Sequence, residues 1–139
     1  MNVDTAIPGS LVIIGPDECI RNPDEQTEGM DRRSGVTPET AGSVNLWSGH
    51  VTTPGGAVAG AHHHGDAESA IYMLSGRARF RWGQHLEHER IAGPGDFIYV
   101  PPNVIHSEEN MSPDEPVVFV VSRNAGTMTT VNVDIEDLA

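Results

Sequence analysis

The sequence predicts an all-β fold, a barrel or sandwich of many short strands, and three observations support this. Turn-forming residues are frequent, with 15 glycines and 10 prolines spread along the 139 residues instead of gathered in one linker. Short stretches such as 77–82 alternate polar and apolar side chains, and 117–121 is a continuous β-branched and aromatic run. Apart from the last few residues, no stretch has a helical period of useful length, so layers of strands are the expected architecture.

Turn signals divide the second part of the chain into short segments. Glycine occurs with proline, serine or aspartate at 53–56, 65–66, 75–76 and 93–96, and each group separates two apolar or alternating runs. The predicted strands are 44–51, 58–64, 70–74, 77–82, 97–100, 117–121 and 127–133.

The first 43 residues are less regular than the rest. Residues 11–14 are apolar and form a candidate strand that ends at a Gly-Pro pair, whereas 20–42 is polar, charged and interrupted by glycine and proline. We therefore expect an N-terminal arm or strand at 1–43, packed on the barrel or on a partner subunit. The barrel itself is expected at 44–139.

Composition excludes several classes of protein. The formal net charge of −12 argues against nucleic acids and anionic membranes as partners, because both would be repelled. Cys19 is the single cysteine, so a scaffold of intrachain disulfides is excluded. The apolar run at 11–14 is too short to span a membrane, and no basic signal region precedes it, so a soluble cytoplasmic protein is expected.

Histidines and one glutamate form the most chemically specific pattern. If residues 60–64 are extended, His62 and His64 point to one face of the strand and His63 to the other. Glu68 returns after a Gly-Asp turn, and His106 follows a rigid Pro-Pro segment at the end of another predicted strand. Two imidazoles, a carboxylate and a third imidazole can converge on one cation.

Two stretches of sequence have the spacing of known motifs. They are Gly56-(5)-His62-His63-His64-(3)-Glu68-(7)-Gly76 and Gly95-(5)-Pro101-Pro102-Asn103-(2)-His106-(3)-Asn110. The first resembles cupin motif one, in which a glycine, five residues, HxH, three or four residues, a glutamate and a glycine about six later follow each other. The second resembles cupin motif two, a glycine, PxG, a histidine and an asparagine. Asn103 stands where the family has glycine, and the gap from Glu68 to Gly76 is one residue longer than the family pattern.

The resemblance to cupins implies a fold and a ligand set. The fold would be a double-stranded β-helix, or jelly-roll, barrel. One divalent transition metal would be held inside it by His62, His64, Glu68 and His106. This mixed nitrogen and oxygen set suits Mn, Fe, Co, Ni, Cu or Zn and does not select among them. An octahedral metal with four protein ligands would keep two adjacent positions open for substrate.

The remaining candidates have simpler interpretations. His63 is expected to face outward, and His50, His85 and His88 to lie at the surface. Glu108 and Glu109 are interpreted as solvated carboxylates and Asn110 as a residue that fixes a turn. Tyr72 is interpreted as a core residue, with lining of the pocket as the alternative. Arg77, Arg79 and Arg81 are expected on an exposed strand face, paired with carboxylates.

The predicted function is that of a metal-dependent oxygenase acting on a small oxygenated or phenolic compound. The metal would chelate substrate oxygens, while Glu68 either stays bound or swings off as a catalytic base. Two alternatives stay open: a non-catalytic sensor or ligand-binding cupin, and a metal-assisted isomerase or cyclase. Two partners are expected, a small molecule and a second copy of the chain. A homodimer is expected because single-barrel cupins are commonly homodimers and the arm before residue 43 is compatible with strand exchange.

Overall fold

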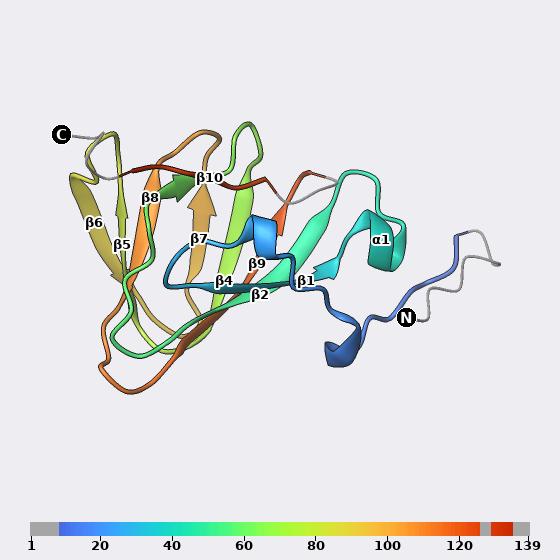
Figure 1. Cartoon of the computed structure of the whole chain (residues 1–139), viewed down its shortest axis with the longest axis horizontal. Coiled ribbons are helices and arrows are strands. Elements are labelled where there is room, and N and C mark those ends of the chain that lie inside the picture. Colours follow the sequence, from blue (N-terminus) through green and yellow to red (C-terminus); the bar gives the residue numbers. More distant parts are fainter. Residues whose placement is uncertain (1–8, 126–128, 135–139) are drawn as a thin grey trace.

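Two antiparallel sheets of five strands face each other in the computed structural model, which describes residues 9–125 and 129–134 (Figure 1). One sheet has the strand order β1-β2-β9-β4-β7 and the other β10-β3-β8-β5-β6. The first comprises β1 Asp31–Val36, β2 Trp47–Thr53, β9 Val117–Arg123, β4 Ser69–Ser75 and β7 Phe97–Val100. The second comprises β10 Val131–Asn132, β3 His62–His63, β8 His106–Asn110, β5 Ala78–Trp82 and β6 His88–Ala92. The all-β prediction is confirmed.

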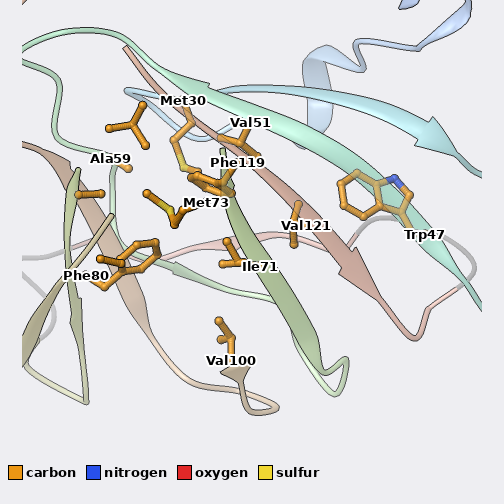
Figure 2. Close-up of a cluster of buried hydrophobic side chains, with 13 residues drawn as sticks. Met30, Trp47, Val51, Ala59, Ile71, Met73, Phe80, Val100, Phe119 and Val121 are labelled. Atoms are coloured by element: carbon orange, nitrogen blue, oxygen red, sulfur yellow. The ribbon is translucent and has the colours of Figure 1, made fainter. Parts of the chain in front are cut away.

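The apolar core lies between the two sheets. Alternate residues of β2 and β9 are buried, as expected for strands with one face toward the core. Figure 2 shows Met73 of β4 between the rings of Phe80 and Phe119, with Ile71 of the same strand nearby. Large apolar side chains that interdigitate in this way supply most of the favourable free energy of folding.

The N-terminal region, expected as an arm or strand at 1–43, contains regular structure. Within residues 20–42 lie β1, which pairs with β2, and the four-residue helix α1 (Pro38–Ala41). Two single-turn 3-10 helices precede β1, namely η1 (Pro16–Glu18) and η2 (Pro23–Glu25). Residues 11–14 form no strand; they lie beside neither sheet and run away from the body of the molecule (Figure 1).

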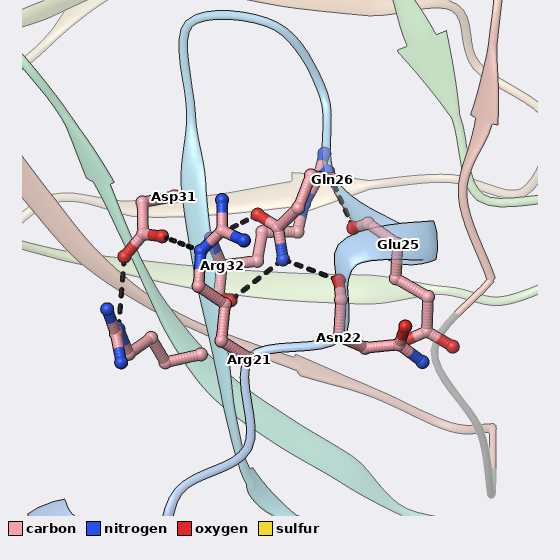
Figure 3. A network of polar contacts seen from close by, with 7 residues as sticks. Arg21, Asn22, Glu25, Gln26, Asp31 and Arg32 are labelled. Carbon is pink, nitrogen blue, oxygen red and sulfur yellow. Dashed lines mark hydrogen bonds and ion pairs between the residues drawn. The ribbon is translucent and has the colours of Figure 1, made fainter.

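A polar network attaches the segment before β1 to the barrel (Figure 3). The side chain of Gln26 accepts a hydrogen bond from the backbone nitrogen of Arg32 and donates to the Arg32 carbonyl. The Arg32 guanidinium donates to Thr27 Oγ1 at 2.7 Å. These bonds fix Arg32 on the inner face of β1, so a cation from the N-terminal part of the chain enters the barrel.

Two other strands are shorter than predicted. The expected strand at 58–64 is reduced to β3 and one isolated bridge between Val58 and Glu109. Of the expected strand at 127–133, residues 127–128 lie outside the described part and β10 covers two residues. Among the described helices, none has the length and apolar character needed to cross a membrane.

Candidate metal centre

Three histidines meet on the inner face of the second sheet. His62 in β3 is paired with His106 in β8, and His64 follows β3 by one residue on the same side of the chain. All three are buried, His62 with 1% of its surface exposed, whereas His63 is half-buried and turned away. The predicted alternation of these residues is therefore what the structure has.

Backbone carbonyls orient each imidazole. The Nδ1 atoms of His62, His64 and His106 lie 2.8, 2.8 and 2.9 Å from the carbonyl oxygens of Gly60, Thr129 and Val104. Because a carbonyl can only accept, each Nδ1 carries the proton and each Nε2 carries a lone pair. This is the orientation of histidines that bind metals through Nε2.

The three side chains are close enough to share one ion. One ring nitrogen from each can be chosen so that all lie within 4.8 Å of one another, and the ring centroids are 4.3 to 5.1 Å apart. Burial lowers the pKa of His62 well below its usual value and that of His106 to about 4. Neutral imidazoles are the form that ligates metals, so this group could hold a metal ion near neutral pH.

A buried cation competes for one of these nitrogens. Arg123, at the end of β9, donates from Nη2 to Nε2 of His64 at 3.0 Å, and its guanidinium lies 4.8 Å from the centre of the Trp47 ring. Since Nε2 has one lone pair, this hydrogen bond and metal ligation by His64 exclude each other. Metal binding therefore requires Arg123 to withdraw.

The loop before His106 supports the second group of motif residues. Asn103 has a φ of 62°, the left-handed conformation that Asn tolerates where the family has glycine. The amide of Asn110 donates to the carbonyls of Thr53 and Glu115 and accepts from the backbone of Ser112. The prediction that Asn110 fixes a turn is confirmed.

Comparison with known proteins decides the family. The model of the cupin domain matches residues 49–123, which is more than half of the chain and includes all three histidines. The chain belongs to the cupin family. No curated protein matches it at a significant level.

Several solved structures resemble this cupin. The oxalate decarboxylase of Bacillus subtilis, studied for its Mn(II) centres, is 26% identical over 78% of this chain and 29% of its own, with a TM-score of 0.67. The polyketide cyclase RemF from Streptomyces resistomycificus is 15% identical over 90% of this chain and 87% of its own, with a TM-score of 0.71. A double-stranded β-helix protein from Klebsiella pneumoniae subsp. pneumoniae is 18% identical over 90% and 99%, with a TM-score of 0.66. The chain spans about a third of the oxalate decarboxylases, 34% and 29% in two of them.

Glu68 lies apart from the histidines in this cupin. Its side chain is exposed, accepts a hydrogen bond of 2.7 Å from the Tyr99 hydroxyl and another of 3.2 Å from Asn124, and is not part of the group that could share an ion. The cause is the register of β4, in which Ser69, Ile71 and Met73 point inward. Glu68 precedes Ser69, so it points to the opposite face.

Ser69 occupies the inward position instead. A gap of four residues after His64 and six before Gly76 fits the cupin spacing, and it ends at Ser69 and not at Glu68. Ser69 has 2% of its surface exposed, is paired with Arg123, and its Oγ has no hydrogen-bond partner among the described residues. The longer gap to Gly76 therefore has a structural meaning, because one residue moves the carboxylate to the other face.

Glu108 is a buried residue of the barrel interior. Its interpretation from the sequence as a solvated carboxylate is wrong, because only 2% of its surface is exposed. Glu108 lies two residues after His106 in β8, so both side chains point into the barrel, whereas Glu109 points out and pairs with Arg79 at 3.3 Å. Burial raises the pKa of Glu108 to about 7, and the nearby charges of Arg32 and Arg123 act in the opposite direction. Residues 106–110 were not predicted as a strand; in an extended segment, alternation would have placed Glu108 on the same face as His106.

The outer strand faces are as polar as expected in one place and more apolar in another. Arg79 pairs with Glu89 and Glu109, as predicted for an exposed cationic face. Tyr72 was interpreted as a core residue, but it is 38% exposed on the outer face, where its ring contacts Phe97. It shares this face with Glu68, as alternation requires.

A cavity of about 550 Å³ is lined by residues of β5, β6 and β7 and by His106 of the metal centre. His106 is one of its lining residues, and aromatic rings form much of the remaining wall, with Arg81 and Arg90 as the cationic groups. This volume is in the range of sites for small organic molecules. The lining includes Phe80, Trp82, Phe97 and Tyr99.

Proposed function

We propose that this cupin is a metal-dependent oxygenase for a small oxygenated or phenolic compound. The observation that carries the proposal is a group of three buried histidines that could share one ion, one of which, His106, lines a cavity with aromatic residues in its wall. In this proposal His62, His64 and His106 are metal ligands, and the compound enters through the cavity that His106 lines. A bound divalent metal would act as a Lewis acid toward substrate oxygens.

The charge of the barrel interior supports an oxygen-rich substrate. Arg32 and Arg123 are both buried and place two positive charges near the histidines, against one carboxylate of Glu108. A divalent cation would increase the positive excess. Anionic or strongly polarised oxygens are then favoured over neutral apolar groups, because the low-dielectric interior strengthens every charge interaction.

The aromatic wall supports a flat organic ring. Phe80 and Trp82 of β5 line the cavity with their aromatic rings. Aromatic rings bind planar apolar surfaces well and restrict their orientation. A catechol, a β-diketone or a flavonol combines such a surface with adjacent oxygens that a metal can chelate.

The first test measures metal content and oxygen uptake in the same preparation. We expect about one Mn, Fe, Co, Ni, Cu or Zn per chain in the purified protein, and loss of this metal in His64→Ala. The metal-loaded protein should then consume oxygen with catechols, β-diketones or flavonols. The absence of bound metal after reconstitution would refute the proposal.

Two outcomes distinguish the alternatives. Product formation without oxygen uptake would favour a metal-assisted isomerase or cyclase. RemF is a polyketide cyclase, but its resemblance to this chain supports only a shared fold. Tight binding of these compounds without any product would favour a ligand-binding or sensor cupin. All three functions use the same cavity, so the proposal depends on turnover and not on binding.

A homodimer is part of the proposal. Leu11 and Ile13 are 80% and 78% exposed on the segment that runs away from the sheets (Figure 1). Apolar side chains on an extended segment are suited to pack on a second copy. Size-exclusion chromatography with light scattering should give twice the chain mass of 14.9 kDa. A monomer would remove the dimer from the proposal without affecting the metal centre.

A further inference from the structure

The carboxylate of Glu108 is buried without a partner that balances it. Its Oε1 lies 3.8 Å from Nε2 of His106, too far for a hydrogen bond, and its Oε2 has no hydrogen-bond partner among the described residues. An ionised carboxylate in such a place costs several kcal/mol unless a cation or donors compensate it. Arg32 and Arg123 act on it through their charge, but Arg123 is hydrogen-bonded to His64 and Arg32 to Thr27.

The position of Glu108 in the sheet places it beside the histidines. Glu108 and His106 are on the same inner face of β8, and His106 is paired with His62 of β3. The carboxylate, His106 and His62 therefore come from two hydrogen-bonded strands of one sheet, and His64 directly follows one of them. Residues on rigid neighbouring strands hold a metal more accurately than residues on loops.

The Glu68 carboxylate, unlike that of Glu108, is exposed and hydrogen-bonded. Its carboxylate is already satisfied by Tyr99 and Asn124 on the outer face of the first sheet, and turning it inward would break both hydrogen bonds and the register of β4. The inward position next to it is Ser69, whose short side chain leaves room in the barrel.

We propose that Glu108, and not Glu68, supplies the carboxylate of the metal centre. The ligand set is then His62, His64, His106 and Glu108, with the carboxylate contributed by β8 instead of β4. As placed, Glu108 is also outside the group of atoms that could share an ion, so ligation requires its carboxylate to turn from His106 toward the shared centre, which side-chain torsions provide without moving the strand. This inference rests on the proposed metal binding and adds the identity of its acidic ligand.

The test compares Co²⁺ binding by the parent protein and by variants that keep size and remove charge. We expect Glu108→Gln to bind Co²⁺ about 100-fold more weakly or worse, since even losses in the outer shell of a metal cost 10- to 100-fold. Glu68→Gln should stay within about threefold of the parent, as should the matched control Glu109→Gln from the outer face of β8. Circular dichroism of the metal-free proteins verifies that each variant is folded.

Glu108→His keeps the test decisive if Glu108→Gln does not fold, and Ser69→Glu extends the test if Glu108→Gln folds. Glu108→His should bind one Co²⁺ with an altered visible spectrum, because nitrogen replaces oxygen in the ligand set. Ser69→Glu in the Glu108→Gln background should regain at least tenfold in Co²⁺ affinity, because it restores a carboxylate at the inward position of β4. An unchanged spectrum in Glu108→His, or parent-like binding in Glu108→Gln, would overturn the inference and leave the metal centre intact.

Loss of Co²⁺ by Glu68→Gln would also overturn the inference, since the carboxylate would then come from β4. A parent protein that binds no Co²⁺ would overturn both the inference and the proposed function. The two failures are therefore distinguishable from the parent titration alone.

Discussion

Two carboxylates are candidates for the metal centre, one just before β4 and one on the inner face of β8. They differ in burial and in hydrogen bonding. Glu68 is exposed and bonded to Tyr99, whereas Glu108 is buried and its Oε2 is without a described partner. The motif spacing favours Glu68, but strand alternation favours Glu108. A sequence motif therefore indicates which segment contains a ligand, and the register of the strand decides which side chain of that segment faces the barrel interior.

The largest effect is expected at the histidine shared by the metal group and the cavity. His106→Ala removes one of three convergent nitrogens, and we expect it to weaken Co²⁺ binding by more than 100-fold. The matched control is His88→Ala, which changes an exposed histidine of β6. Titration followed by visible absorption measures both. Equal affinity in the two variants would contradict the assignment of the metal centre to the inner face of the second sheet.

The pH dependence of the metal-free protein tests the burial of the same groups. The pKa of His106 is lowered from 6.5 to about 4, so the unfolded chain binds more protons between these values and folding stability decreases as the pH falls through them. His106 alone accounts for about 3 kcal/mol in this range. His62 and His64 act in the same direction, since burial lowers the pKa of both.

Glu108 acts in the opposite direction. Its pKa is raised from 4.5 to about 7, so its contribution increases stability as the pH falls between these values, by an amount similar to that of His106. The three histidines outweigh this one carboxyl. Urea unfolding at pH 7 and pH 5, after removal of metal by a chelator, should therefore give the lower free energy of unfolding at pH 5. An increase at pH 5 would mean that the histidines are not buried as neutral groups.

A smaller effect, of opposite sign, is expected at Arg123. Arg123→Met keeps an apolar contact with Trp47 but removes the hydrogen bond to His64 and one buried positive charge. We expect Co²⁺ affinity to rise about tenfold, which corresponds to about 1.4 kcal/mol, the size of one competing hydrogen bond. Calorimetric titration beside the parent protein measures this. Weaker binding would show that Arg123 supports the centre, for example through Glu108, instead of competing with the metal.

The smallest effect is expected at the start of β4. Tyr99→Phe removes the hydroxyl that bonds to Glu68, and both residues are exposed. We expect the midpoint of thermal unfolding to change by no more than about 2 °C and Co²⁺ affinity to stay the same, because exposed hydrogen bonds contribute little. A loss of metal in Tyr99→Phe would connect the outer face of β4 with the centre and would weaken the contrast between the two carboxylates.

Local patterns were enough to predict much of this molecule. Alternation at 77–82 and the β-branched run at 117–121 correctly predicted β5 and β9, since the period of a strand depends only on its own residues. The same period gave the shared face of His62 and His64. The left-handed backbone of Asn103 followed from the chemistry of one side chain.

Other features depended on partners far away in the chain. The segment 20–42 has no strong strand signal, and β1 forms there because β2 offers an unpaired edge. Residues 11–14 have the apolar character of a strand but find no neighbour in the described structure.

The sequence by itself determined the resemblance to cupins, strands such as β5 and β9, and three of the residues proposed to hold the metal, because each depends on spacing within a short segment. Tertiary structure decided which carboxylate is buried. Glu68 and Glu108 are both glutamates, and each follows a motif histidine closely in the sequence. Only the register of β4 and β8, in opposing sheets, makes one exposed and the other buried. A side chain is buried when other parts of the chain cover it. Glu108 is covered by the first sheet, whose strands come from residues 31 to 123, so its burial depends on segments far away in the sequence.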